Sequence, residues 1–102
     1  TKTLATQVGK FGITVNCIHP GTTRTERTIS LMEARGKELG MSPADAEAHD
    51  FADGSPRTNH INRMVDASEI GYLTAYLASD KSWAVTGEVV MAGGGTGNAV
   101  YY

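Results

Sequence analysis

Residues 12–21 constrain the fold of this chain more than any other stretch. Gly12 and Pro20 bound a run of β-branched and other apolar residues at 13–18, whose apolar side chains fall on both faces of an extended strand. This pattern is typical of a buried parallel strand. Residues 1–9 have helical spacing and end at a glycine, so a helix end feeds this strand through a short turn. The order predicts half of a βαβ unit and an α/β fold.

Residues 26–62 have a different texture, with short and weak helical patterns. One helix is expected over 28–39, ended by Gly40, and a second begins at Ser42 with Pro43 at its first position. Residues 54–56 then break the chain again. We predict that this segment is a mobile excursion over a site, with a plain surface connection as the alternative.

Regular structure returns at Asp66. A helix is expected over 66–79 and a second strand over 88–92, followed by a run of glycines. One apolar stripe of the helix contains Ile70, Leu73 and Leu77, and an adjacent row contains Tyr72 and Tyr76. The expected order is therefore helix end, strand, excursion, helix, strand and tail.

Two kinds of site are disfavoured by the sequence. The glycines at 93–97 follow a strand, but the phosphate loop of a dinucleotide site needs a helix after it, and only five residues follow. We therefore interpret them as a turn at the end of an edge strand. The three histidines have no metal-type spacing with one another or with Cys17, so no metal site is expected.

Charge and cysteine content narrow the partners and the compartment. The net charge is −2 and basic residues are scattered among acids, so no nucleic-acid footprint exists. No apolar run approaches the roughly 20 residues of a membrane-spanning helix. The single Cys17 suits a reducing compartment, so a cytoplasmic location is expected.

Several threonines follow Pro20 and Gly21 at the end of the first expected strand. In a doubly wound sheet, ligands gather outside the carboxyl ends of the strands. Hydroxyl groups that donate and accept hydrogen bonds there suit a carboxamide or a phosphate. Threonine-rich turns also occur without any ligand, so the pattern alone leaves both interpretations open.

At this point the chain resembles the C-terminal portion of the short-chain dehydrogenase/reductase family. The stretches that carry the resemblance are residues 4–5, 12–16, 20–21, 63–70, 76–80, 85–87 and 89–94. They resemble the family's helix and "GI-VN" strand, its Pro-Gly turn followed by Thr, its "PEEIA" helix start, its "YLASD" helix end, its "ITG" turn and its last strand ending in two glycines. The excursion at 26–62 lies outside the resemblance.

The resemblance implies a Rossmann-like, doubly wound parallel sheet and the cofactor NAD or NADP. Its cofactor turn would comprise Pro20, Gly21, Thr22, Thr23 and Thr25. The backbone after Pro-Gly would meet the nicotinamide carboxamide, and the hydroxyl of Thr25 would support the carboxamide or the diphosphate. Thr23 departs from the family's usual branched aliphatic residue.

A second departure is Ala92, which stands where an Asp often precedes the two glycines.

The resemblance also implies a division of the chain. Residues 1–25 would form helix end, strand and cofactor turn, residues 26–62 the substrate lid with Ile29 and Met32, and residues 66–102 the helix, last strand and tail. The family's phosphate loop and its catalytic Ser, Tyr and Lys have no counterpart in these residues. No catalytic residue is therefore expected here, and we expect the 102 residues alone to be inactive and either poorly folded or swapped with another copy.

Two functions remain open. The first is part of an NAD(P)-dependent oxidoreductase that interconverts an alcohol and a carbonyl compound by hydride transfer. The second is a non-catalytic oligomerisation module or inactive fragment. In either case the resemblance implies a homodimer or homotetramer formed through residues 66–79 and 88–92, with Tyr72, Tyr76 and Trp83 as suitable interface residues. The substrate and the choice between NAD and NADP stay open.

Overall fold

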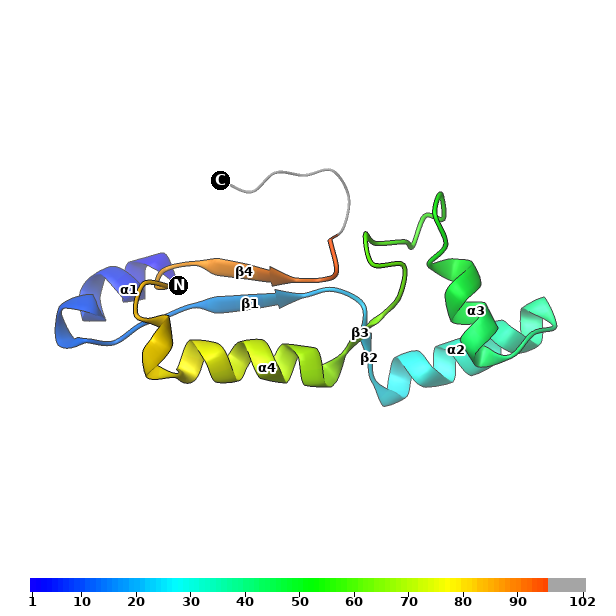
Figure 1. The fold of residues 1–102 in the computed structure, drawn as a ribbon, viewed down its shortest axis with the longest axis horizontal. Helices are drawn as coiled ribbons and strands as arrows, with labels where there is room; N and C mark the ends of the chain where they lie inside the picture. The colour runs from blue at the N-terminus through cyan, green and yellow to red at the C-terminus, as the bar shows by residue number, and fades with distance from the viewer. Residues whose placement is uncertain (96–102) are drawn as a thin grey trace.

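The computed structural model describes residues 1–95 as an α/β arrangement of helices and parallel strands (Figure 1). The helices are α1 (Lys2–Val8), α2 (Glu26–Leu39), α3 (Pro43–Asp50) and α4 (Ala67–Ala78), with short 3₁₀ helices η1 (Gly9–Phe11) and η2 (Asp80–Ser82). The strands are β1 (Cys17–Pro20), β2 (Thr23–Arg24), β3 (Val65–Asp66) and β4 (Val89–Ala92). The expected order of helix end, strand, helical excursion, helix and strand is confirmed.

Two parallel pairs of strands form the sheet elements. β1 pairs with β4 from Cys17 opposite Val89 to Pro20 opposite Ala92. β2 pairs with β3, with Thr23 opposite Val65, and this two-residue pair was not expected from the sequence. Parallel pairing requires a crossover: α2 and α3 lie in the connection from β2 to β3, and α4 lies in the connection from β1 to β4, running alongside the strands (Figure 1).

The expected bounds of the first strand, 13–18, were wrong. The strand begins at Cys17 because its partner β4 begins only after the turn at Gly87. Before it, Val15 accepts a hydrogen bond from the Gly87 amide at 2.8 Å, and the Asn16 side chain donates to the Val85 carbonyl at 2.9 Å. These contacts hold residues 15–16 next to the turn at Gly87, and not next to a second strand.

The expected burial of this strand was also wrong. Cys17 and His19 are exposed and Ile18 is only half-buried. Within residues 1–95, β1 pairs with β4 alone, so one edge of each strand carries unpaired backbone groups. The apolar pattern is typical of a strand with a neighbouring strand on each side, whereas among residues 1–95 β1 has one neighbouring strand.

The helix caps explain where the helices begin and end. α2 starts at residue 26, two residues earlier than expected, because Thr25 and Thr28 form a reciprocal capping box. It ends at Gly40, which has a left-handed φ of 68°. α3 begins as expected, with the Asp45 amide donating to the Ser42 hydroxyl at 3.1 Å.

The expected apolar stripe of α4 is the more buried side of this helix. Ile70, Leu73 and Leu77 are half-buried, whereas the side of the helix with Tyr72 is open to solvent, Tyr72 being 74% exposed. The cluster of buried apolar side chains lies elsewhere, within the excursion and directly before β3. It comprises Met32, Phe51 and Met64.

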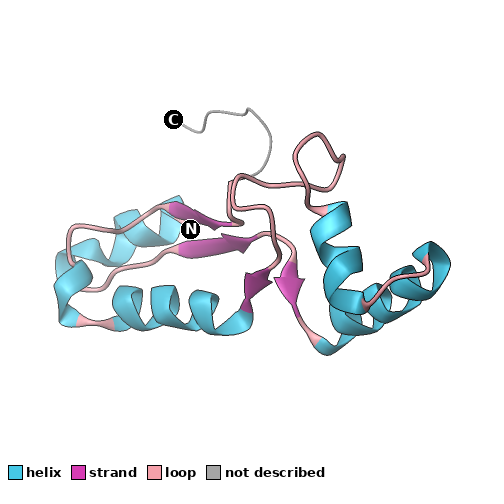
Figure 2. Cartoon of the chain, turned by 45° about the vertical axis from the view of Figure 1, so that its right-hand side comes forward, coloured by secondary structure: helices cyan, strands magenta, loops and turns pink. Residues whose placement is uncertain are grey.

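The molecule is elongated and has two lobes, which Figure 2 shows: one contains β1, β4, α1 and α4, and the other contains α2 and α3. The two lobes meet at β2 and β3. The radius of gyration is 17.2 Å, whereas a compact domain of this length has about 13 Å. The accessible surface of 7124 Å² likewise exceeds the roughly 5,500 Å² typical of a monomer of this mass.

Candidate functional site

The Pro-Gly turn lies at the carboxyl ends of two parallel strands. Pro20 is the last residue of β1, and the Gly21 amide donates to the Ala92 carbonyl at 3.2 Å. A Cβ atom at Gly21 would lie 2.5 Å from Gly93 Cα. The two strand ends are therefore so close that only glycine fits at residue 21.

The threonines after the turn have three different environments. Thr22 is exposed, and its carbonyl accepts a hydrogen bond from the Val65 amide at 2.9 Å. The Thr23 hydroxyl donates to the Gly21 carbonyl at 3.0 Å, which braces the turn. The Thr25 hydroxyl accepts the Thr28 amide at the start of α2. Of these three threonines, Thr22 alone has a hydroxyl without a hydrogen-bond partner among residues 1–95.

A cavity of about 500 Å³ adjoins Thr22 and extends under the excursion. Its floor contains the buried cluster of Met32, Phe51 and Met64. The other residues that line it are Thr22, Thr28, Leu31, Pro56, Arg57 and Thr58. We call this space the Thr22 cavity. Its size and its largely apolar lining, with a few polar groups, are typical of a small-molecule site.

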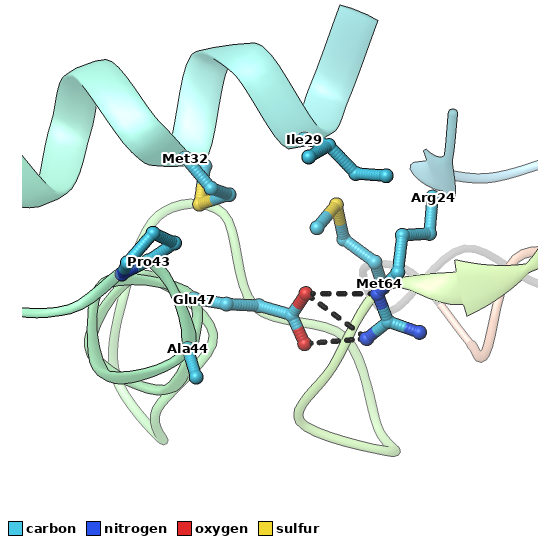
Figure 3. A pocket seen from close by; sticks show the side chains of 7 residues that line it. All are labelled: Arg24, Ile29, Met32, Pro43, Ala44, Glu47 and Met64. Carbon is cyan, nitrogen blue, oxygen red and sulfur yellow. Dashed lines mark hydrogen bonds and ion pairs between the residues drawn. The ribbon is translucent and has the colours of Figure 1, made fainter. Parts of the chain in front are cut away.

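A smaller cavity of about 240 Å³ lies between α2 and α3 (Figure 3). Ile29, Met32 and Met64 form apolar walls, and Arg24 and Glu47 meet across the space. Met32 and Met64 line both cavities. The structure therefore places both expected lid residues at cavities, although Ile29 lines only the smaller one.

Arg24 is the central charged residue between the lobes. Its Nη2 atom lies 2.7 Å from Glu47 Oε2 and 3.0 Å from Oε1, and its Nη1 atom donates to the Asp66 carboxylate. Hydrogen bonding to Glu47, which outweighs the opposing effect of burial, raises the pKa of Arg24. The guanidinium thus joins β2, β3 and α3 while remaining charged.

The glycines after β4 accept hydrogen bonds from the end of the excursion. The His60 amide donates to the carbonyls of Gly94 at 3.0 Å and Gly95 at 2.9 Å. The Asn59 side chain, which is buried, donates to the carbonyls of Arg63 at 2.7 Å and Gly93 at 3.4 Å. The expected turn at 93–95 is present, and its carbonyls anchor the excursion. Residues 96–97 of the glycine run lie outside the described residues.

A buried carboxylate organises the far end of the excursion. Asp50 has a side chain only 5% exposed and accepts hydrogen bonds from Arg35 at 3.2 Å and 3.3 Å. Burial raises the pKa of Asp50, but the hydrogen bonds from Arg35 and His49 outweigh it, so the pKa is lowered. Arg57 approaches the same carboxylate at 3.7 Å.

The structure brings some of the expected site residues together and separates others. Thr22 and Met32 share one cavity, and Pro20 and Gly21 shape the turn that leads to it. Thr25 lines neither cavity and serves as the cap of α2. This placement leaves the expected cofactor role of the turn as a hypothesis, with Thr22 as its best-placed residue.

Sequence reasoning missed the polar residues that hold the site together, namely Arg24, Glu47, Arg57 and Asn59. Glu47 lies 23 positions from Arg24 along the chain. No periodic spacing connects such residues, so no signal in the sequence pairs them. The glycine run could be recognised in the sequence, but the segment at 59–60 that bonds to it could not.

Two negative findings concern residues 1–95. No group of three or more His, Cys, Asp or Glu side chains is arranged to hold a metal ion in this part of the chain. Within the same residues, no helix has both the length and the apolar character needed to cross a membrane.

Comparison with known proteins gives a consistent family assignment. Residues 1–97 match the family model described as enoyl-(acyl carrier protein) reductase. The NADPH-dependent reductase BacG of Bacillus subtilis is 33% identical over 96 residues, which are 94% of this chain and 35% of BacG.

Solved structures give the same result. A short-chain dehydrogenase family protein from Francisella tularensis superimposes with a TM-score of 0.70 at 31% identity, covering 92% of this chain and 37% of that one. L-sorbose reductase from Gluconobacter frateurii, complexed with NADPH and L-sorbose, has a TM-score of 0.77 at 27% identity and covers 97% and 36%. The chain spans about a third of the length of the curated relatives it matches.

Proposed function

Because the chain belongs to the short-chain dehydrogenase/reductase family, we propose that it is the C-terminal part of an NAD(P)-dependent oxidoreductase. The reaction is the interconversion of an alcohol and a carbonyl compound on a small-molecule substrate. The names of relatives support this proposal, since BacG is an NADPH-dependent reductase and L-sorbose reductase was solved with NADPH.

One observation carries the proposal: the Pro-Gly turn stands at the carboxyl ends of β1 and β4 and opens into the Thr22 cavity. Ligands of open α/β sheets bind at that edge. A turn for the cofactor and a cavity for the substrate would then lie side by side, as hydride transfer requires.

The residues present fit a nicotinamide carboxamide at the turn. Thr22 is exposed, and its hydroxyl can donate and accept a hydrogen bond. Thr23 would hold the backbone of the turn in place through its bond to the Gly21 carbonyl. Bound NAD(P) supplies the hydride chemistry, while these residues would bind and orient the nicotinamide end.

The excursion supports the role of a substrate lid. Its second helix is anchored to β2 by the bond between Glu47 and Arg24, and its end is anchored by His60 and the glycine carbonyls. In its first helix, Met32 contributes to the floor of the Thr22 cavity. Such a segment would exclude water from the reacting atoms and shape the pocket.

We further propose that residues 1–102 alone do not catalyse the reaction. The described residues lining the Thr22 cavity include no Tyr, His, Asp, Glu or Lys that could act as a proton donor or acceptor. The cofactor phosphates would also need a glycine-rich loop followed by a helix, which this sequence does not contain.

The exposed free thiol of Cys17 supports a reducing, cytoplasmic location.

A titration of the native polypeptide with NADPH and with NADH, followed by cofactor fluorescence, tests the proposal. We expect saturable binding of at least one cofactor, weakened by Thr22→Val, which keeps the shape and removes the hydroxyl. Thr74→Val on α4 is the matched control, since Thr74 lies outside both cavities. No binding of either cofactor would refute the proposal.

A second candidate is a non-catalytic oligomerisation module. It is favoured by the aromatic side chains left open on one side of the sheet lobe, where Tyr72 is 74% and Trp83 58% exposed. Aromatic residues are enriched in the buried centres of protein interfaces. This function predicts self-association without cofactor binding, so the same titration separates the two candidates.

A further inference from the structure

The Thr22 cavity has one end that differs in charge from the rest. Its floor is formed by the apolar side chains of Met32, Phe51 and Met64, which are buried, with exposed fractions of 6%, 2% and 2%. Among the described residues that line it, Arg57 is the one charged side chain. A ligand that fills this space must therefore place an apolar body on the floor and meet a guanidinium group.

The charge of Arg57 is only weakly compensated. Its nearest partner, Asp50, lies 3.7 Å away, beyond normal hydrogen-bond length. Asp50 is already bound more closely by Arg35, at 3.2 Å and 3.3 Å, and by His49 at 3.2 Å. A second acid near Arg35, Glu38, pairs with Arg35 at 3.1 Å.

Arg57 also has donors to spare. Its backbone amide is bound to the Ser55 hydroxyl at 3.4 Å, but its guanidinium makes no hydrogen bond to any residue in the described part of the chain. The side chain is 64% exposed, so it can reorient without losing buried contacts. A planar guanidinium with free donors binds a carboxylate in a two-point arrangement.

We propose that the substrate of this site is an alcohol or carbonyl compound with an aliphatic or aromatic body and a carboxylate, and that Arg57 binds this carboxylate. The inference rests on the proposed function for the position of the reacting carbon, which faces Thr22. The apolar floor favours a carboxylate on a hydrocarbon body over a sugar, whose many hydroxyl groups would lose their water without partners there.

The test compares hexanoate, 1-hexanol and hexyl phosphate as probes of the native polypeptide, using calorimetry with and without saturating cofactor. We expect hexanoate to bind about tenfold more tightly than 1-hexanol. Arg57→Gln should weaken hexanoate binding about tenfold and leave 1-hexanol binding within about twofold. Unchanged 1-hexanol binding also shows that the variant is folded.

Arg27→Gln on α2 is the matched control, since Arg27 lines neither cavity, and it should leave all three probes unchanged. Equal losses for hexanoate and 1-hexanol, or no loss for either, would overturn the assignment. Tighter binding of hexyl phosphate that depends on Arg57 would overturn the carboxylate in favour of a phosphate ester.

The same experiment separates this inference from the proposed function. Cofactor binding without Arg57-dependent binding of hexanoate would refute the substrate class and leave the oxidoreductase standing. Arg57-dependent hexanoate binding without any cofactor binding would establish the carboxylate site and refute the oxidoreductase.

Discussion

Arg24 in β2 and Glu47 in α3 form a two-point ion pair, in which Arg24 Nη2 lies 2.7 Å from Glu47 Oε2 and Arg24 Nε lies 3.3 Å from Glu47 Oε1 (Figure 3). Both side chains are partly buried, 31% and 17% exposed. The pair ties the strand that follows the Pro-Gly turn to the second helix of the excursion.

The first prediction concerns this ion pair. Glu47→Gln removes the charged partner that α3 offers to Arg24, while Asp66 in β3 stays in place, so α3 should separate from β2 more often. We expect the backbone amides of α3 to exchange with deuterium about tenfold faster, since a partly buried hydrogen bond to a charged group contributes about 1.5 kcal/mol. Hydrogen exchange followed by mass spectrometry measures this. Glu38→Gln, whose side chain is 70% exposed beside Arg35, is the control and should change exchange little.

The second prediction concerns the contact between the strand ends. Gly21→Ala places a methyl group 2.5 Å from Gly93 Cα, so the two turns must move apart. We expect the free energy of unfolding to fall by about 1–3 kcal/mol in chemical denaturation. Gly71→Ala is the matched control, because nothing lies within 4 Å of its Cβ on α4. That control should raise stability by about 0.5–1 kcal/mol, so a loss there would show a general intolerance to alanine.

The third prediction separates the two roles of Thr25. Thr25→Ala removes the cap of α2 and should lower the free energy of unfolding by about 1 kcal/mol. Thr25→Asp keeps a capping oxygen and should keep the stability close to that of the parent chain. If Thr25 also lies by the cofactor diphosphate, Thr25→Asp should weaken NADPH binding by charge repulsion. Parent-like affinity in that variant would restrict Thr25 to capping.

The fourth prediction concerns acid stability. Hydrogen bonds from Arg63 and from the Asp66 amide lower the pKa of Glu69 from 4.5 to about 2. A lowered pKa in the folded state means that the contribution of Glu69 is complete above about pH 4.5 and is lost as the pH falls towards 2. Glu69→Gln should therefore flatten the fall in stability across that range, measured by urea denaturation.

The control for this measurement is Glu33→Gln, an exposed position on α2 with no ion pair among residues 1–95. It should leave the shape of the acid profile unchanged. An unaltered slope in Glu69→Gln would mean that Arg63 does not hold the carboxylate in solution.

The fifth prediction concerns assembly. We propose that copies of the protein associate through residues 66–79 and 88–92, and Tyr72 is the most exposed large apolar side chain there, at 74%. Tyr72→Glu should shift the native polypeptide towards the monomer in sedimentation velocity, because a charge would be buried in the interface. Tyr72→Phe keeps the apolar area and should leave the assembly intact. Identical sedimentation of the parent and Tyr72→Glu would place the interface elsewhere.

Much of the fold could be predicted from local signals. The cap at Ser42, the left-handed Gly40 and the stripe of Ile70, Leu73 and Leu77 appear in the structure as the sequence indicates. Each depends on residues within a few positions of one another, where helix geometry and cap chemistry act directly. The Pro-Gly turn and the order of strand, helix and strand were predictable for the same reason.

The sequence by itself determined these elements and the family resemblance, whereas the tertiary structure alone decided the strand bounds and the site contacts. β1 begins at Cys17 because its partner begins at Val89, which no local pattern contains. The pair of Arg24 and Glu47 joins residues far apart in the chain, and so does the bond of Asn59 to Gly93. Such contacts depend on how distant segments meet in space, and side-chain spacing along the chain does not encode that meeting.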